Sequence, residues 1–150
     1  KNTKANDYVS SYVLNLVSVT EIIRAFQDNL KTNKGSVVLF STVAAKKGFP
    51  NHSIISSAKA GVEGLTVALA AELAPNIRIN CIAPSLTKSK MASLVIKNSS
   101  VEETISKMHP LKRIGEGIDS ANLASFLLTE KSSWITGQVI GVDGGRSSIA

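Results

Sequence analysis

The stretch that decides the fold is Gly35-Ser-Val-Val-Leu-Phe-Ser-Thr42, a short apolar run that is rich in β-branched residues and starts at a glycine. Such a run predicts a buried strand over residues 36–41. A helical pattern follows over residues 53–73, and a second apolar run over residues 77–83 stops at Pro84. Because helices and buried strands alternate, we predict an α/β layered domain with a mainly parallel sheet.

The segment before this centre also has helical periodicity. Apolar residues recur every three or four positions over residues 7–30, which predicts one long helix. Asn6 or Asp7 can cap its start, and Gly35 lies just after its expected end.

The segment after Pro84 predicts a long loop, a helix and a last strand. We expect short helices near residues 91–97 and 101–108, and a helix that Asp119 caps and that runs through Leu128. The final strand is expected over residues 138–142. Three strands are few for a doubly wound sheet.

Size and composition fit one folded domain. The chain has 150 residues, of which 43% are hydrophobic and 19% charged, so it can bury one substantial core. No apolar run approaches about 20 residues, and we therefore expect no membrane span. The chain begins without an initiator Met, which we interpret as a fragment.

Charge and cysteine content narrow the possible partners. The formal charge is +6, but the basic residues are scattered and carry no interleaved aromatics, so we expect no nucleic-acid partner. The single cysteine, Cys81, excludes an internal disulfide and a cysteine-based zinc site, and no other metal site is expected. Its apolar neighbours predict a buried strand thiol, which suits a reducing cytoplasm.

Five segments follow one another in the order of a known family. They are Gly35-Ser-Val-Val-Leu-Phe-Ser-Thr42, Gly48-Phe-Pro-Asn-His-Ser53, Ile55-Ser-Ser-Ala-Lys59-Ala-Gly-Val62, Arg78-Ile-Asn-Cys-Ile-Ala-Pro84 and Ile135-Thr-Gly-Gln-Val-Ile-Gly-Val-Asp-Gly-Gly145. Over nearly the whole chain, this order resembles the C-terminal half of the short-chain dehydrogenase/reductase family. The pattern is nearest to 3-oxoacyl carrier-protein reductases and to sugar or alcohol dehydrogenases.

The resemblance implies a fold and a cofactor. It implies the C-terminal half of a three-layer, Rossmann-like, doubly wound parallel sheet, with residues 1–150 forming part of one NAD(P)-binding domain. The chain contains no Gly-rich turn of the kind that holds a pyrophosphate, so the dinucleotide-binding half is expected to lie outside it. NAD and NADP both remain open.

The resemblance also assigns catalytic positions. The family uses a Tyr as proton donor, a Lys four residues later that lowers the pKa of the Tyr, a Ser that orients the substrate oxygen, and an Asn that continues the proton relay. Lys59 takes the Lys position, Asn15 the Asn position and Thr42 the Ser position. Ile55 takes the place of the Tyr.

Each of these matches has a simpler interpretation. Lys59 could be an ordinary solvated lysine, Asn15 could bond to nearby backbone, and Thr42 could be a plain hydroxyl at a strand end. Ile55 is the decisive departure because a hydrocarbon side chain neither donates nor accepts a proton. His52 is a conceivable substitute acid.

The loop after residue 83 matches the family's nicotinamide contacts. The cofactor-binding candidates there are Pro84, Thr87 and Ser89, and Lys59 is expected to hold the ribose. Ser85 replaces a family Gly, which puts the close approach of the backbone to the cofactor in doubt.

Two functions stay open at this stage. The first is a nicotinamide-dependent oxidoreductase of the carbonyl and alcohol class, impaired by Ile55 and Thr42. The second is a non-catalytic homologue that acts as a binding or oligomer subunit. The resemblance implies a homodimer or homotetramer, in which Ile135, Val139 and Ile140 could pack across a two-fold axis.

Overall fold

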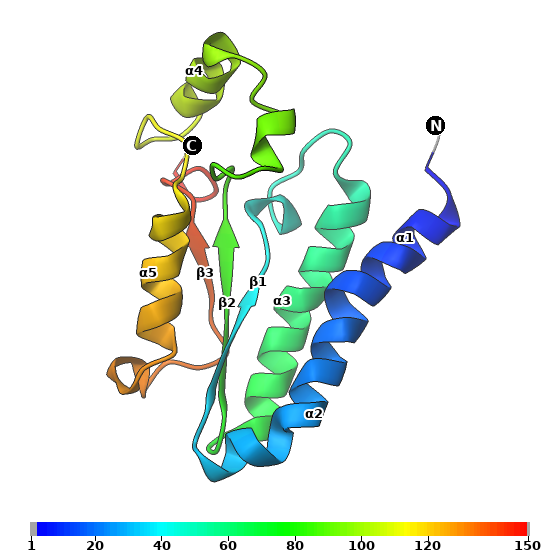
Figure 1. Cartoon of the computed structure of the whole chain (residues 1–150), viewed down its shortest axis with the longest axis vertical. Helices are drawn as coiled ribbons and strands as arrows, with labels where there is room; N and C mark the ends of the chain where they lie inside the picture. The colour runs from blue at the N-terminus through cyan, green and yellow to red at the C-terminus, as the bar shows by residue number, and fades with distance from the viewer. Residues whose placement is uncertain (1–2, 150) are drawn as a thin grey trace.

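The structure is a computed structural model that describes residues 3–149. Its elements, in chain order, are α1 (Ala5–Tyr12), η1 (Val13–Val17), α2 (Ser18–Thr32), β1 (Ser36–Phe40), η2 (Val43–Ala45), α3 (Ser53–Leu73), β2 (Arg78–Pro84), η3 (Ala92–Leu94), α4 (Ser99–Lys107), α5 (Gly117–Leu127), η4 (Glu130–Ser132) and β3 (Val139–Val142). Figure 1 shows the three strands pointing the same way, with their carboxyl ends at the top of the view.

The sheet in the described part of the chain has the strand order β1-β2-β3, and both pairs are parallel. Val38 lies opposite Asn80, and Ile82 lies opposite Ile140. β2 is the central strand, and five of its seven residues are buried. β1 forms an open edge, where Phe40 is 44% exposed.

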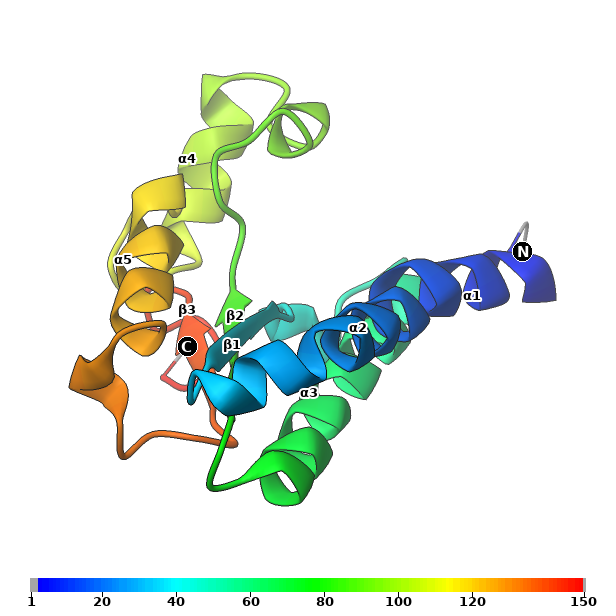
Figure 2. The same ribbon diagram turned by 60° about the horizontal axis from the view of Figure 1, so that its bottom comes forward.

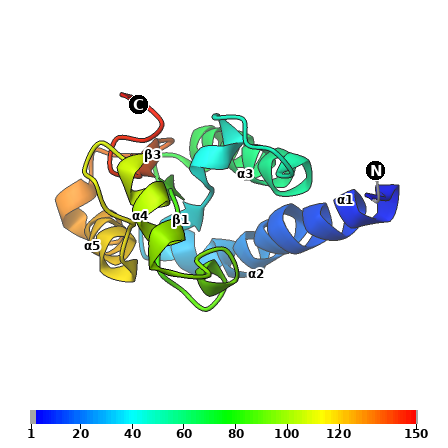
Figure 3. The ribbon, with the colours of Figure 1, turned by 90° about the horizontal axis from the view of Figure 1, so that it is seen from above.

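Helices cover the sheet on both faces, which gives three layers. Seen from above in Figure 3, α5 lies on one side of the strands, and α2 and α3 lie on the other. The alternation of helices and strands thus produces a parallel α/β sandwich, and the predicted three-layer α/β class is confirmed. Figure 2 shows that η3 and α4 project away from this sandwich, beyond the strand ends.

The two faces of β2 carry different chemistry because side chains alternate along a strand. Ile77, just before the strand, and Ile79 and Cys81 within it join the core cluster with residues of α2 and α3. On the opposite face, the Asn80 Nδ2 donates to the Ile135 carbonyl at 3.0 Å, and the Asn80 Oδ1 accepts from the Gln138 N–H at 3.1 Å. Asn80 is fully buried, so these bonds satisfy it without water.

Arg78 adds further contacts on the polar face. Its guanidinium donates to the carbonyls of Leu127 at 3.1 Å and Thr129 at 3.1 Å, and to the Ser132 Oγ at 2.9 Å. These acceptors lie at the end of α5, in the turn after it and in η4. A planar guanidinium can bind several acceptors at once, and Arg78 therefore fixes the turn after α5 against the sheet.

The first predicted helix is present but contains a π turn that the sequence pattern did not reveal. The helix begins at Ala5, and residues 13–17 form the π turn between its two α-helical parts. Asp7 lies inside the first turn, where its carboxylate accepts the Lys4 N–H at 2.8 Å. The prediction that Asn6 or Asp7 is the N-cap residue was therefore wrong, although Asp7 does satisfy a donor at this end.

A similar correction applies to α5. The helix begins at Gly117, and Asp119 is its third residue. Its carboxylate accepts the Glu116 N–H at 2.7 Å, so it stabilises the helix start from within the first turn. The prediction that Asp119 is the N-cap residue was wrong for the same reason as for Asp7: a carboxylate can reach back to the start of its helix.

The remaining elements lie close to their predicted ranges. α3 has the predicted bounds, and each strand begins or ends within one residue of its prediction. The predicted helix at residues 91–97 is only the short 3-10 turn η3, whereas α4 is a helix that Asn98 caps through the Val101 N–H. Val139 packs against the core of its own chain.

Two helices in the described residues, Ala5–Thr32 and Ser53–Leu73, are long and apolar enough to cross a membrane by length and composition alone. This is weak evidence for a span, because a core helix of a folded domain passes the same criterion, and α3 packs against the sheet. The expectation of no membrane span stays a prediction.

Candidate functional site

Candidate residues from three segments lie near the carboxyl end of the sheet. Thr42 follows β1, Pro84 ends β2, and Ile55 and Lys59 lie in the first two turns of α3. Figure 1 shows the start of α3 at the same end of the molecule as the strand tips. Parallel strands bring their carboxyl ends to one edge, which explains why residues far apart in sequence gather here.

Lys59 turns its ammonium toward the end of β1. Its Nζ donates to the Phe40 carbonyl at 2.8 Å, and partial burial lowers the pKa of the amine from its ordinary value. An ammonium has three donors, so two remain for a ligand. The interpretation of Lys59 as a freely solvated lysine is therefore wrong: the side chain is held at the sheet edge.

Ile55 is half-buried and lies four residues before Lys59 on α3. This spacing places both side chains on one helix face, one turn apart. The resemblance assigns a phenol to this position, whereas the side chain here is a hydrocarbon, which can carry no proton.

The hydroxyls at the end of β1 have different surroundings. The Thr42 Oγ1 accepts the Ala44 N–H at 3.3 Å, which caps η2 and leaves the hydroxyl proton available. Ser41 is buried, and its hydroxyl donates to the Glu63 Oε1 at 2.8 Å. Ser41 therefore cannot replace Thr42 in a substrate contact.

Asn15 lies in the middle of the π turn. Its Nδ2 donates to the Ser11 carbonyl at 2.9 Å and lies 3.4 Å from the Ser11 Oγ. The structure thus gives Asn15 the local backbone bond of the simpler interpretation. The π turn was missed from the sequence, and such turns are common at functional sites, because they change the direction of one side chain within a helix.

The loop after β2 turns its hydroxyls toward its own backbone. The Thr87 Oγ1 donates to the Ser85 carbonyl at 3.0 Å, and the Ser89 Oγ accepts the Ala92 N–H at 3.1 Å. Ser85 is not among the described non-glycine residues with positive φ, which are Lys34, Asn51 and Lys112. The backbone at residue 85 therefore does not require a glycine here.

One ammonium connects this loop to its surroundings. The Lys88 Nζ lies 3.4 Å from the Glu102 Oε1 of α4 and 3.1 Å from the Glu116 Oε1 just before α5. Glu116 and then Glu102 raise the pKa of Lys88. The three groups lie at the surface.

His52, the conceivable substitute acid, is exposed and lies just before α3. Its Nδ1 is 2.7 Å from the Pro50 carbonyl, and its ring lies 5.6 Å from the ring of Phe49. The ring is thus engaged within its own loop.

The donors present fit only the nicotinamide end of a dinucleotide. Lys59 offers two free N–H donors and Thr42 a hydroxyl proton, which suit a ribose and a substrate oxygen. The Thr87 hydroxyl donates to the loop itself, whereas the Ser89 Oγ accepts a backbone N–H and, like Thr42, keeps its hydroxyl proton available. Among residues 3–149, no cluster of three His, Cys, Asp or Glu side chains is placed to hold a metal ion.

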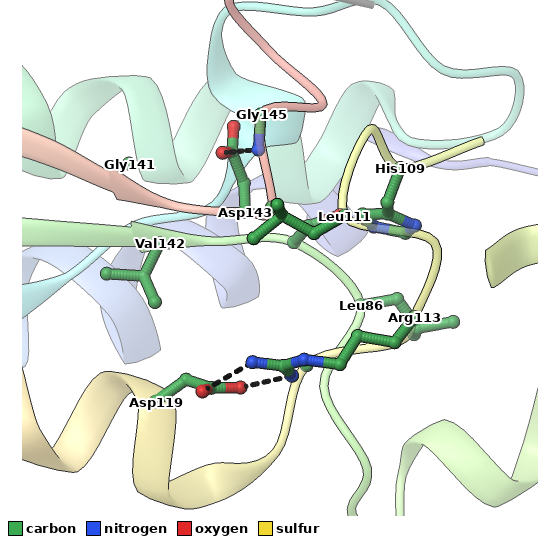
Figure 4. A pocket seen from close by; sticks show the side chains of 12 residues that line it. Leu86, His109, Leu111, Arg113, Asp119, Gly141, Val142, Asp143 and Gly145 are labelled. Atoms are coloured by element: carbon green, nitrogen blue, oxygen red, sulfur yellow. Dashed lines mark hydrogen bonds and ion pairs between the residues drawn. The ribbon is translucent and has the colours of Figure 1, made fainter. Parts of the chain in front are cut away.

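A second polar region, which the sequence did not predict, lies where β2 and β3 end, beside the start of α5. It surrounds a cavity of about 350 Å³, lined by Ser85, Leu86, His109, Leu111, Arg113, Gly115, Asp119, Gly141, Val142, Asp143, Gly144 and Gly145. Figure 4 shows His109 and Leu111 on one side and the Arg113–Asp119 pair on another. None of the seven candidate residues lines this cavity.

Two carboxylates of the cavity are held in fixed positions. Arg113 donates to both carboxylate oxygens of Asp119, at 2.7 and 2.8 Å, and this pairing lowers the pKa of Asp119 to about 2. Asp143 accepts the Gly145 N–H at 2.9 Å and also bonds Ser147, and these hydrogen bonds lower its pKa despite partial burial. Ser85 and residues 141–145 of the last family segment were singled out from the sequence and line this cavity, but the cavity itself was not predicted.

The family profile and the curated relatives that match this chain agree on one family. A family profile described as enoyl-(acyl carrier protein) reductase matches residues 1–147. Dehydrogenase/reductase SDR family member 4 from Homo sapiens is 40% identical over 119 residues, which cover 79% of this chain and 43% of that protein.

Solved structures agree with this match and confirm the predicted Rossmann-like class. ElxO with NADP bound has a TM-score of 0.88 at 30% identity, and the match covers 98% of this chain and 60% of ElxO. A gluconate dehydrogenase from Agrobacterium tumefaciens, described as putative, has a TM-score of 0.93 at 27% identity, with 99% and 60% covered. The chain spans less than half the length of the curated relatives it matches.

Proposed function

The chain belongs to the short-chain dehydrogenase/reductase family, and from this premise we propose that it is an oxidoreductase-like protein of the carbonyl and alcohol class whose proton transfer is impaired. NAD or NADP is the cofactor that the family implies, and a small carbonyl or alcohol is the substrate class. The observation that carries the proposal is the hydrocarbon of Ile55 on the same helix face as Lys59.

In this proposal, Lys59 and Thr42 have separate roles in binding. Lys59, held by the Phe40 carbonyl, would bind the ribose, and the Thr42 hydroxyl would orient the substrate oxygen. When bound, the nicotinamide supplies or accepts the hydride. The proton has no carrier at residue 55, so a carbonyl oxygen that receives hydride would have to take its proton from solvent.

A cofactor-oxidation assay tests this proposal. The unmodified protein should show no turnover with a panel of ketones and acyl substrates. Ile55→Tyr together with Thr42→Ser should raise the rate by about 10²- to 10⁴-fold, because that is the usual contribution of a positioned general acid. Val67→Tyr, at an exposed position of the same helix, is the matched control and should have no effect.

Calorimetric titration with NADH and NADPH separates the two possible losses. Cofactor binding without turnover supports the missing proton donor as the cause. Rapid turnover by the unmodified protein would contradict the proposal.

The second candidate is a non-catalytic homologue that serves as a binding or oligomer subunit. The long helix leaves large apolar side chains uncovered: Leu14 is 74% exposed, Phe26 61% and Ile22 59%. Exposed apolar surface of this kind marks interaction sites. A homodimer or homotetramer would cover it, and we propose this helix as part of the contact.

Analytical ultracentrifugation tests the second candidate. Phe26→Glu should shift the protein toward monomer, because it places a charge in the apolar contact. Lys31→Glu, also exposed on α2, is the control and should leave the association unchanged. A monomeric unmodified protein would contradict this proposal.

We also propose a reducing compartment such as the cytoplasm. Cys81 is fully buried, and burial is the main cause that raises the pKa of its thiol to about 11. The buried strand thiol was predicted from sequence, and it needs no oxidising partner. Microscopy of a tagged protein would test the location, and a signal confined to the secretory pathway would contradict it.

A further inference from the structure

The cavity beside α5 contains a serine hydroxyl bonded to a buried imidazole. The Ser85 Oγ and the His109 Nε2 are 2.8 Å apart, and His109 is 1% exposed. The other ring nitrogen, Nδ1, lies 2.9 Å from the Ile105 carbonyl. These two residues are 24 positions apart in sequence, and the fold alone brings them together.

The Ile105 carbonyl fixes the tautomer of the imidazole. A carbonyl oxygen only accepts, so the His109 Nδ1 must carry the proton and donate it. The Nε2 then has a free lone pair, and the Ser85 hydroxyl donates to it. This is the arrangement of an activated nucleophile: a hydroxyl bonded to a base that a third group orients.

A positive charge lies beside the same hydroxyl. The Arg146 Nη1 is 3.4 Å from the Ser85 Oγ, and its guanidinium carbon is 4.9 Å from the centre of the Phe49 ring. The Lys47 Nζ donates to the Arg146 carbonyl at 2.9 Å, which helps to fix the backbone there. A guanidinium at this place can stabilise negative charge that develops on an oxygen next to Ser85.

The cavity can hold a small apolar group. Its volume of about 350 Å³ is within the usual range for small ligands, and Leu86, Leu111 and Val142 contribute apolar walls. Figure 4 shows these three side chains around the space, with the Arg113–Asp119 pair beside it. Because Arg113 is neutralised by Asp119, an uncharged acyl chain suits the cavity better than an anion.

We propose that Ser85 and His109 form a hydrolytic site for small, uncharged carboxylic esters, in which neither Lys59 nor Thr42 takes part. The Ser85 Oγ attacks the ester carbonyl, and its proton passes to the His109 Nε2. The ester C–O bond breaks, and the leaving alcohol takes that proton. Water then attacks the acyl-serine with His109 as base, which releases the acid and restores the hydroxyl. The balance is ester plus water to acid plus alcohol.

Hydrolysis of p-nitrophenyl butyrate by the chain tests this site without any nicotinamide. Ser85→Ala should lower kcat/KM by about 100-fold or more, and His109→Gln by a similar factor, because the nucleophile and base act as a unit. Ser133→Ala, at an exposed serine after η4, is the matched control and should leave the rate unchanged. Circular dichroism melting checks that each variant is folded.

A covalent label gives an independent readout. Treatment with a fluorophosphonate and peptide mass spectrometry should place the adduct on Ser85 in the unmodified chain and in the Ser133→Ala variant. The adduct should be lost in His109→Gln, and Ser85→Gly, which restores the family's glycine, should lose both label and hydrolysis. Hydrolysis that persists in Ser85→Ala and Ser85→Gly, or a label absent from Ser85, overturns the proposal.

Discussion

The two faces of the central strand are built on different principles. Toward α2 and α3, β2 presents Ile79 and Cys81 to an apolar cluster, in which burial of hydrocarbon supplies the stability. Toward α5, the same strand presents Arg78 and Asn80. Their side chains form hydrogen bonds to the backbone of Leu127, Ile135 and Gln138. The apolar face depends on volume, whereas the polar face depends on the position of each atom.

The two proposed sites at the carboxyl end of the sheet, one around Lys59 and one around Ser85, also differ. Beside α3, Ile55 lies at the position to which the resemblance assigns the acid, and Thr42 caps a turn. At the end of β2, the Ser85 hydroxyl contacts both His109 and Arg146. If both proposals hold, a family position is retained here without its acid, and the proposed hydrolytic chemistry depends on polar side chains that meet at the end of β2.

The largest expected effect is on the apolar face. Ile79→Ala should lower the free energy of unfolding by about 2–5 kcal/mol, because Ile79 is fully buried and the truncation leaves a cavity. Urea denaturation measures the change. Val67→Ala, at an exposed position of α3, should cost less than about 0.5 kcal/mol. Equal losses in the two variants would contradict the assignment of the core.

A smaller effect is expected on the polar face. Asn80→Ala should cost about 1–3 kcal/mol, because it leaves the Gln138 N–H without its acceptor and leaves the Ile135 carbonyl only the Arg78 Nη1, at 3.4 Å. The same urea titration applies, and amide exchange at Gln138 should rise. Gln138→Ala is the control, because its side chain is exposed and its main-chain bond to Asn80 is kept. No change in the exchange at residue 138 would argue against this link.

The smallest effect is a pH dependence at the start of α5. The hydrogen bonds from Arg113, and then that from the Glu116 N–H, lower the pKa of Asp119 from 3.8 to about 2. A lowered carboxyl pKa in the folded state stabilises above the unfolded value, and this contribution is lost as pH falls from about 3.8 through about 2.

Asp119→Asn should therefore lower the urea midpoint near pH 7 and match the unmodified chain near pH 2. Glu130→Gln, at an exposed residue of η4, should show no such convergence. A difference for Asp119→Asn that stays constant with pH would refute the role of this ion pair.

Local patterns predicted the elements well because periodicity and prolines are local signals. The run from residue 53 to residue 73 and Pro75 after it define α3, and the β-branched run before Thr42 defines β1. Asp7 and Asp119 were misplaced as N-cap residues, because a carboxylate can serve a helix start from the third position as well as from the cap.

The candidate site was only partly predictable. Family order placed Thr42, Ile55 and Lys59 at one end of the sheet, and their elements do meet there. The contact between Ser85 and His109 could not be predicted, because it depends on how the loop after β2 folds against the turn after α4. The π turn around Asn15 has no periodicity signal of its own.

The ion pairs of Lys88 lead us to expect that salt loosens the projecting segment, which consists of η3 and α4. At about 1 M salt the screening length falls to about 3 Å, which is comparable to the 3.1 and 3.4 Å separations of its two ion pairs. Amide exchange in residues 99–107 should then accelerate while that of β2 stays slow. We therefore expect the projecting segment that carries α4 to become more mobile as ionic strength rises.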